Sequence, residues 1–269
     1  LIGIFHNFAD MTLVTSPQMQ KALQRYGVKH VEVWQKGIDT GRFHPKHYSE
    51  EMRNALSNSH PSDPLLLYVG RLGREKKLEQ LKYTLEQIPN ARLALVGEGP
   101  NEEQLRRHFK GTNTKFMGVL RGEALSQAFA SADVFCMPSD SETLGFVVLE
   151  SMASGVPVVA ANAGGLPDLI DHGITGYLAT VGDAEEFTER VKELIENPEL
   201  RQKVGKAARA ESEQWSWEEA TRQLREVHYP RVLEIHRQRK SRRWSVWIYN
   251  GIKTVVSALT GRRNAHRVD

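Results

Sequence analysis

The sequence has only one cysteine, Cys136, in 269 residues. A lone thiol cannot form an internal disulfide, which excludes a disulfide-stapled scaffold and suits a reducing compartment. We expect Cys136 to be a small buried hydrophobic residue. The ten histidines are scattered, and no Cys/His cluster has the spacing of a metal site. His44 and His172 are therefore interpreted as ordinary surface or loop residues, and no bound metal is predicted.

Internal repeats and low-complexity segments are also missing. In the apolar segment near the carboxy terminus, Asn250 and Lys253 interrupt the run well short of the roughly 20 residues that cross a bilayer. The 40% hydrophobic content is enough for a sizeable core. Strand-like and helical patterns alternate from Leu65 to about Leu194, which predicts one doubly wound α/β domain with a parallel sheet.

The strands of this domain are expected where short apolar runs end in glycine or proline turns. Five or six strands are expected, and five of them are located, with two of the intervening helices: strands over residues 65–69, 92–96, 115–120, 132–137 and 157–161, and helices over 102–109 and 146–152. Apolar runs of this kind are typical of buried parallel strands. The turns after them would lie at the carboxyl edge of the sheet, where open α/β sheets bind ligands.

The segment SDSETLGFVVLE, residues 139–150, is the most informative part of the chain. It follows a predicted strand and opens a predicted helix, whose free N–H groups and dipole favour an anion such as a phosphate. Gly145 would let the backbone approach that anion. Glu142 would lie beside it, and Glu150 would turn toward sugar hydroxyls. The alternative is a surface loop with two solvated acids.

A basic loop, Gly-Arg-Leu-Gly-Arg-Glu-Lys-Lys at residues 70–77, follows the first strand. Arg71 is a rigid fork and Lys76 a mobile point charge, a combination suited to a diphosphate. A basic loop after a strand can also be simply solvated.

Two glycine pairs carry weaker signals. Gly97 and Gly99 follow the second strand, but the third glycine and the later acid of a dinucleotide fingerprint are missing, which disfavours a dehydrogenase. Gly164 and Gly165 follow the fifth strand, where paired glycines often serve only tight packing.

Together these motifs resemble the nucleotide-sugar-binding half of the retaining GT-B glycosyltransferases, of the family 4 type. The matching features are Gly-Arg-Leu followed by Glu-Lys, Glu-x7-Glu over 142–150, Gly-x-Pro-Val-Val over 155–159 and Gly-Gly-x-Pro-Asp over 164–168. The resemblance covers about residues 10–235. Within that superfamily, residues 34–45, 118–130, 138–150 and 160–168 are most similar to the plant, algal and cyanobacterial sulfoquinovosyltransferases, which pass sulfoquinovose from UDP to diacylglycerol.

The resemblance implies roles for the site residues. Arg71 and Lys76 would hold the diphosphate and neutralise the leaving group, and Glu142 would support an oxocarbenium-like transition state without acting as a covalent nucleophile; these three are the expected catalytic residues. Main-chain groups near Leu120 would face the uracil, and Glu150 the ribose. The full expected donor-binding set is Gly70, Arg71, Lys76, Leu120, Glu142, Thr143, Leu144, Gly145, Phe146, Val147 and Glu150.

The resemblance also implies a division of the chain. Residues 1–30 would be the end of an amino-terminal acceptor domain, 31–207 a Rossmann-like nucleotide-sugar domain, 208–236 a helix crossing back, and 237–269 a basic amphipathic tail. We expect the chain to be a fragment, with the acceptor site and a catalytic histidine in the missing domain. A signal or transit peptide would be missing as well.

Charge is concentrated in the predicted tail. Residues 237–269 hold nine lysines and arginines and one acid, a formal charge of +8, which leaves −5 on the rest to give the total of +3. Basic residues followed by an aromatic and apolar helix face suit the interface of an anionic membrane. A solvated or crossing helix is the main alternative. Nucleic acid is a weaker one, because nothing else resembles an RNA- or DNA-binding module, and no nucleic-acid partner is expected.

The predicted function is therefore transfer of sulfoquinovose from UDP-sulfoquinovose to diacylglycerol at a membrane surface. The location would be a chloroplast membrane or the cytoplasmic face of a cyanobacterial one, as a peripheral protein. No tightly bound cofactor is expected; Mg²⁺ could aid the diphosphate but is not required. The alternatives are another UDP- or GDP-hexose-dependent transferase, or a nucleotide-sugar-binding fragment inactive without its amino-terminal domain.

Overall fold

The computed structural model describes residues 2–34, 37–142, 145–241 and 252. The chain divides into two compact units, one formed by residues 1–34 with 221–269 and the other by residues 35–220. The boundaries expected at residues 30, 207 and 236 stay predictions about domain organisation. Each unit is described below by itself.

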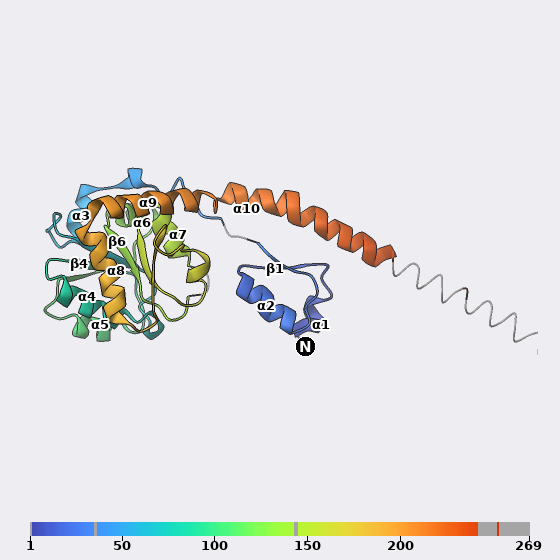
Figure 1. The fold of residues 1–269 in the computed structure, drawn as a ribbon, viewed down its shortest axis with the longest axis horizontal. Coiled ribbons are helices and arrows are strands. Elements are labelled where there is room, and N and C mark those ends of the chain that lie inside the picture. The colour runs from blue at the N-terminus through green and yellow to red at the C-terminus, as the bar shows by residue number, and fades with distance from the viewer. Residues whose placement is uncertain (1, 35–36, 143–144, 242–251, 253–269) are drawn as a thin grey trace, which may run out of the picture. The chain divides into compact units, whose positions relative to one another are not determined.

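A parallel sheet forms the centre of the larger unit (Figure 1). Its six strands have the order β5-β4-β3-β6-β7-β8. Its strands are β3 (Leu65–Val69), β4 (Arg92–Val96), β5 (Thr114–Gly118), β6 (Val134–Met137), β7 (Val158–Ala161) and β8 (Gly176–Ala179). The five expected strands and the doubly wound α/β class are thus confirmed. The strand β8 was not located from the sequence, because its four residues begin with glycine and form no long apolar run.

The central strands are apolar because both of their faces are covered. Every residue of β3, β6 and β7 is buried. In the register of the sheet, Leu66 of β3 lies opposite Leu93 of β4 on one side and Val134 of β6 on the other. Parallel strands covered on both faces have this composition. Cys136 of β6 is fully buried, and burial raises the pKa of its thiol.

Helices form layers on the two faces of the sheet. Helices α4, α5 and α8 lie on one face, and α6, α7 and α9 lie with α3 on the other (Figure 1). Their bounds are α3 (Glu50–Leu56), α4 (Leu81–Gln87), α5 (Glu102–His108), α6 (Gly122–Ala130), α7 (Phe146–Ala153), α8 (Ala184–Glu196) and α9 (Pro198–Glu213). Side-chain caps fix several starts: Ser49, Asp183 and Asn197 accept hydrogen bonds from backbone N–H groups of α3, α8 and α9.

Short 3-10 helices complete this unit. They are η1 (Pro45–His47), η2 (Arg74–Lys76), η3 (Leu78–Gln80) and η4 (Leu166–Asp168). The turn η2 lies directly after β3, in the basic loop.

The strand order places a topological switch between β3 and β6. From β3 the chain moves to β4 and β5 on one side, and later returns to β6, β7 and β8 on the other. Because the two crossovers leave in opposite directions, the loops after β3 and β6 diverge at the carboxyl edge. Ligands of open α/β sheets bind at this position. The basic loop and the Glu142 loop are the two loops that follow these strands.

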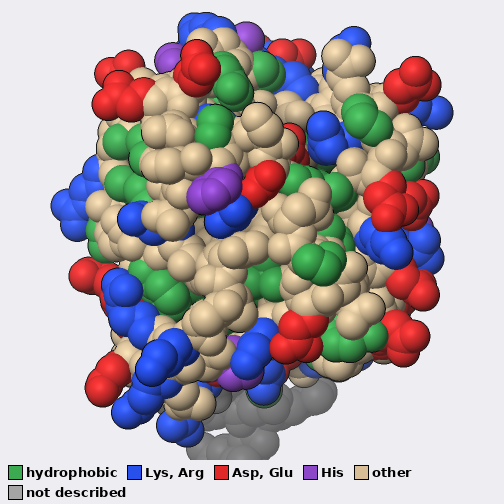
Figure 2. Space-filling view, turned by 90° about the vertical axis from the view of Figure 1, so that its left-hand side faces the viewer, with side chains coloured by type: hydrophobic (Ala, Val, Ile, Leu, Met, Phe, Trp, Pro, Cys, Tyr) green, Lys and Arg blue, Asp and Glu red, His purple; other side chains and the backbone are tan. Residues whose placement is uncertain are grey.

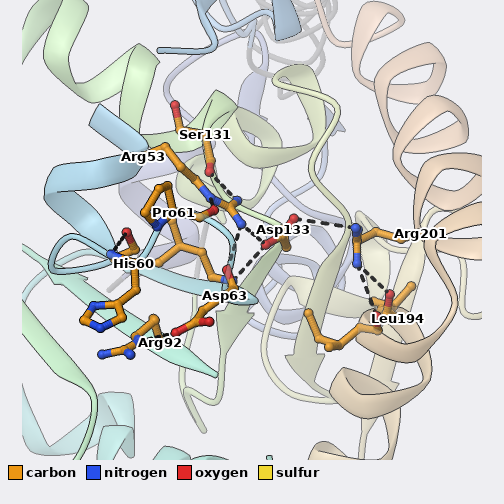
Figure 3. A network of polar contacts seen from close by, with 12 residues as sticks. Arg53, His60, Pro61, Asp63, Arg92, Ser131, Asp133, Leu194 and Arg201 are labelled. Carbon is orange, nitrogen blue, oxygen red and sulfur yellow. Dashed lines mark hydrogen bonds and ion pairs between the residues drawn. The ribbon is translucent and has the colours of Figure 1, made fainter. Parts of the chain in front are cut away.

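At the other edge of the sheet, where the strands β3 and β6 begin, Arg53 is the centre of a hydrogen-bond network (Figure 3). Its guanidinium donates to the carbonyls of Pro61, Ser131 and Asp63 at 2.9–3.0 Å and to the carboxylate of Asp133 at 2.7 Å. The same Asp133 oxygen accepts the backbone N–H of Leu65 at the start of β3. This network fixes the beginnings of β3 and β6. It therefore also fixes the directions of these two strands and the positions of the loops that follow them.

The smaller unit contains α1 (Ile2–His6), β1 (Thr12–Val14), α2 (Pro17–Arg25) and β2 (Val31–Val33), with β1 and β2 paired in parallel. Helix α10 (Trp217–Gln223) continues through a π-helical turn, Leu224–His228, and helically to residue 241. Within this unit His228 and Arg231 contact the carboxylate of Glu32 at 2.9 and 2.8 Å.

A second polar contact in the smaller unit joins Asp10 to His236 at 2.9 Å and to Arg239 at 3.1 Å. Hydrogen bonds from these two side chains lower the pKa of Asp10. The predicted basic tail beyond residue 241 lies outside the described residues, apart from Ile252. Among the helices in the described ranges, we find no candidate for a membrane span.

The space-filling view shows one face of the molecule, on which acidic and basic side chains lie interspersed and hydrophobic ones form only small separate groups (Figure 2). Such a mixture is typical of a solvated surface.

Candidate functional site

An ion pair links the two loops at the switch point. The Nζ atom of Lys76, in the turn after β3, donates to Oε2 of Glu142, in the loop after β6, at 2.7 Å. Both side chains are largely buried, with exposed fractions of 15% and 17%. The other oxygen of Glu142 accepts the backbone N–H of Gly145 at 3.3 Å. The structure therefore brings together Lys76, Glu142 and Gly145, all three expected from the sequence, and holds the carboxylate in a fixed direction.

The backbone of Glu142 is fixed by the glycine pair after β7. The N–H of Gly165 donates to the Glu142 carbonyl at 2.7 Å. Gly164 has a φ of +58°, and a Cβ there would collide with the same carbonyl oxygen. Glycine is thus required at position 164 for both conformation and space. The pair serves close packing, as the sequence suggested, and what it packs against is the expected catalytic loop.

Arg71 lies in the turn after β3, where its backbone is fixed and its side chain is exposed. The hydroxyl of Tyr68 donates to the carbonyl of Arg71 at 2.9 Å, and Tyr68 is fully buried. Burial, reinforced by the carboxylates of Glu142 and Glu75, raises the pKa of Tyr68, so this hydroxyl keeps its proton and remains a donor. The guanidinium of Arg71 contacts the carboxylate of Glu75, four residues on.

The turns after β3 and β4 are in direct contact. The N–H of Gly70 donates to the Val96 carbonyl and that of Leu72 to the Glu98 carbonyl, both at 2.9 Å. A Cβ on Gly97 would collide with the carbonyl oxygen of Gly70. The glycines of this weak nucleotide signal therefore let two turns lie against each other. Leu120 follows β5 at the same edge, two strands from β3.

Helix α7 begins directly after the Glu142 loop. Gly145 precedes it with a φ of +57°, and Phe146 and Val147 form its first turn. The positive end of the helix dipole lies at this turn, where an anion is favoured. Thr143 and Leu144, also expected to bind the donor, lie outside the described residues.

Glu150 lies one turn further along α7 with an unusual carboxyl group. Burial raises its pKa to about 7, and the cation of Arg42 opposes that shift. Within the described residues its carboxylate has no hydrogen-bond donor. A half-buried carboxyl in this state is suited to accept hydroxyl groups of a ligand, because those donors would stabilise its charged form.

Metal binding finds no support in the side chains of the described ranges. They contain no group of three or more His, Cys, Asp and Glu residues that could hold an ion. His44 caps η1 by accepting the N–H of Lys46, and His172 accepts the N–H of Leu178, so each has a local structural contact.

Tyr68 and Glu75 are the contributors that the sequence did not single out. Tyr68 reads as one apolar residue of a buried strand, and only its position three residues before Arg71 could have indicated the contact. Glu75 was part of the Glu-Lys motif but carried no role of its own.

The loops after β3 and β6 bring two cations, Arg71 and Lys76, and one carboxylate, Glu142, to the switch point, where α7 also begins. Glu150 lies on that helix. These are the groups needed to neutralise a phosphate leaving group and to accept sugar hydroxyls.

Comparison with known proteins finds relatives that are named as sugar transferases. The chain is 45% identical over 246 residues to the sulfoquinovosyl transferase SQD2 of Arabidopsis thaliana, covering 89% of this chain and 48% of that protein. It is 35% identical over 213 residues to a GDP-mannose-dependent alpha-mannosyltransferase of Mycobacterium tuberculosis, covering 79% of this chain and 54% of that protein. The chain thus spans about half the length of these relatives.

Solved structures show the same architecture. Sucrose-phosphate synthase from Thermosynechococcus elongatus matches with a TM-score of 0.73 and 29% identity, over 82% of this chain and 58% of that one. The Anabaena protein HepE in complex with UDP and glucose matches with a TM-score of 0.76 and 25% identity, over 85% of this chain and 65% of that one. Residues 50–211 match the family described as Glycosyl transferases group 1. The chain is therefore a member of the group 1 glycosyl transferases, with the parallel α/β architecture of the GT-B enzymes.

Proposed function

We propose that this chain is the donor-binding part of a retaining glycosyltransferase that transfers sulfoquinovose from UDP-sulfoquinovose to diacylglycerol. The observation that carries the proposal is the 45% identity to an enzyme named for sulfoquinovosyl transfer, over 89% of the chain. The ion pair of Lys76 and Glu142 at the switch point also supports it, because a cation for the diphosphate and a carboxylate for the sugar lie side by side there.

In this proposal the two cations act on the leaving group. When the bond between the anomeric carbon and the diphosphate oxygen breaks, negative charge grows on UDP. Arg71, Lys76 and the first turn of α7 would neutralise it, which lowers the barrier because the charge is larger in the transition state than in the substrate.

The carboxylates act on the sugars. Glu142, held by Lys76 and Gly145, would lie beside the transferred sugar and stabilise positive charge at its anomeric carbon. Glu150 would accept the ribose hydroxyls, with main-chain groups near Leu120 facing the uracil. Arg71 and Lys76 supply cations for the diphosphate, so the proposal includes no resident metal.

A second candidate is a hexosyltransferase that uses a GDP-sugar. Its support is the GDP-mannose dependence of two relatives that are 35% and 32% identical to the chain. Calorimetric titration of the 269-residue chain with UDP and with GDP separates the two candidates. Tight binding of UDP alone is expected, and a preference for GDP would reject the uridine donor.

Turnover is tested on the full-length protein with diacylglycerol in vesicles. UDP-sulfoquinovose, UDP-glucose and GDP-mannose are supplied in parallel, and the lipid product is identified by mass spectrometry. Sulfolipid is expected only with the first donor. If another donor is consumed and no sulfolipid forms, the proposed substrate is wrong. Binding of UDP by the 269-residue chain without transfer would identify this piece as a binding module.

Membrane attachment through residues 237–269, at a chloroplast or cyanobacterial membrane, is part of the same proposal. Arg239 contacts Asp10 and the carbonyls of Asn7, Phe8 and Ala9. A truncation after Ser241 is therefore preferable to one at residue 237, because it removes basic residues and keeps that contact. Sedimentation with vesicles containing anionic lipid is expected to capture the complete chain and not the truncated one.

A further inference from the structure

Two cations and two carboxylates meet at the turn after β3. Arg71 contacts Glu75, and Lys76 contacts Glu142. The formal charges of these four side chains cancel. A diphosphate placed among them is therefore strongly attracted only when one carboxylate leaves its cation.

Glu142 is not the carboxylate that leaves. It is 17% exposed, its second oxygen accepts the Gly145 N–H, and its own carbonyl is fixed by Gly165. Glu75 is different, since its side chain is 34% exposed and that of its partner Arg71 is 61% exposed. Exposed pairs are weak and exchange partners at little cost.

The backbone of Glu75 is fixed, and its carboxylate lies against Arg71. The backbone carbonyl of Glu75 accepts the hydroxyl of Ser139 at 3.2 Å and the N–H of Asp140 at 3.3 Å, so only its side chain is free to move. That carboxylate lies over Gly73, where a Cβ would collide with it. The φ of Gly73, −112°, is open to any residue, so its backbone conformation does not require glycine.

We infer that Glu75 sets the affinity for the donor as a built-in anionic competitor, which occupies the guanidinium of Arg71 and which the donor diphosphate must displace. This inference rests on the proposed function of the site. After transfer, Glu75 would take Arg71 back and so favour release of UDP, whose diphosphate carries more negative charge than the diphosphate of the donor.

The variant Glu75→Gln tests this directly, because it removes the charge and keeps the shape. We expect calorimetry of the 269-residue chain to show UDP binding about threefold to fivefold tighter than in the wild type. Stopped-flow measurement should show the gain as slower dissociation. Uridine, which has no phosphate, should bind both proteins equally. Glu75→Asp, which keeps the charge and shortens its reach, should fall between the two.

The matched control is Glu196→Gln. Glu196 forms the same kind of pair, with Lys192 four residues earlier, at the end of α8 and the opposite edge of the sheet. It changes the net charge equally and should leave UDP binding unchanged. In an Arg71→Gln background, Glu75→Gln should give no gain, because the pair is already broken.

Unchanged or weaker UDP binding by folded Glu75→Gln protein, or an equal gain in the Arg71→Gln background, would overturn the inference while the proposed function stands. If the wild-type chain is folded and binds neither UDP nor GDP, both the inference about Glu75 and the proposed function are wrong.

Discussion

Lys76 and Glu142, 66 residues apart in the sequence, form an ion pair between the two loops of the switch point, with 2.7 Å between Nζ and Oε2. Each would have a separate role toward the donor, one at the diphosphate and one at the sugar. Their contact means that each also sets the position of the other.

Breaking this pair should affect stability and binding in different ways. Lys76→Gln leaves a largely buried carboxylate without its cation, so we expect a loss of about 2 kcal/mol in the free energy of unfolding. The double variant Lys76→Gln with Glu142→Gln should recover part of that loss in urea titrations. UDP affinity should fall at least about tenfold in both. A double variant no more stable than the single one would show that the pair is not coupled.

Gly164→Ala should disturb the Glu142 loop more than a comparable glycine substitution elsewhere. Gly173→Ala is the matched control, because Gly173 also has a positive φ, +80°, but a Cβ there meets nothing within 4 Å. We expect about 1 kcal/mol of destabilisation for Gly173→Ala from backbone conformation, and about 3 kcal/mol for Gly164→Ala from conformation and collision. Thermal and urea unfolding compare them. Equal losses would contradict the close approach to the Glu142 carbonyl.

The strands and the loops of the site could be predicted because they depend on local pattern. The run Leu65–Val69 is apolar on both faces and ends in glycine, and the Glu142 loop is followed by helical spacing. The expected class of ligand came from the residue types in those loops, and the proposed donor came from resemblance alone.

The contacts that hold the site could not be predicted, because they join residues far apart or depend on burial. Asp133 lies 80 residues from Arg53, and no local pattern marks the two as partners. Tyr68 looks like any core residue until the turn above it is known. The pKa of Glu150 depends on how deeply α7 is packed, which its own sequence does not determine.

Arg53→Met should destabilise the protein without altering the site. The variant removes four hydrogen bonds and leaves Asp133 without its principal cation, so we expect a loss of about 3 kcal/mol. Arg107→Met is the control, since Arg107 is 72% exposed and paired with an exposed Glu103; its loss should be within about 0.5 kcal/mol. UDP affinity at a temperature where both variants are folded should match the wild type. A large drop in UDP affinity for Arg53→Met would mean that the contacts at the starts of β3 and β6 also affect the site.

Tyr68→Phe should loosen the turn that carries Arg71. The carbonyl of Arg71 would lose the Tyr68 hydroxyl and keep only the N–H of Gly73, at 3.0 Å. We expect this loss to cost about 1 kcal/mol of stability and to weaken UDP binding about threefold. Tyr177→Phe is the control, because the Tyr177 hydroxyl also donates to a partner, Glu193 at 3.2 Å, but lies on β8 at the edge of the sheet. Calorimetry at one pH compares the two. Unaltered UDP binding by Tyr68→Phe would show that the hydroxyl does not position Arg71.

The raised pKa of Glu150 gives stability a predictable dependence on pH. Its folded pKa of about 7 lies above the ordinary value of 4.5 because burial disfavours the charged form. The favourable contribution of Glu150 to the free energy of unfolding is therefore fully present below about pH 4.5. It is lost as the pH rises to about 7, which is a change of about 3 kcal/mol. Glu150→Gln, which is always neutral, should be the more stable protein at pH 8. The two should converge toward pH 4.5 in urea titrations.

UDP binding should show the opposite trend at the same residue. Ribose hydroxyls that donate to Glu150 stabilise its charged form, so binding requires the carboxyl to release its proton. With a pKa of about 7, roughly one tenth of the molecules carry the charge at pH 6 and roughly nine tenths at pH 8, which predicts an increase in affinity of up to about tenfold over this range. The UDP phosphate titrates as well. Comparison with the Glu150→Gln variant corrects for this, because the variant keeps the pH dependence due to the phosphate and loses the one due to Glu150. Calorimetry in buffers of different ionisation enthalpy should detect proton release on binding to the wild type in excess of that seen with the variant. Identical pH profiles for the two proteins would mean that the ribose does not contact Glu150.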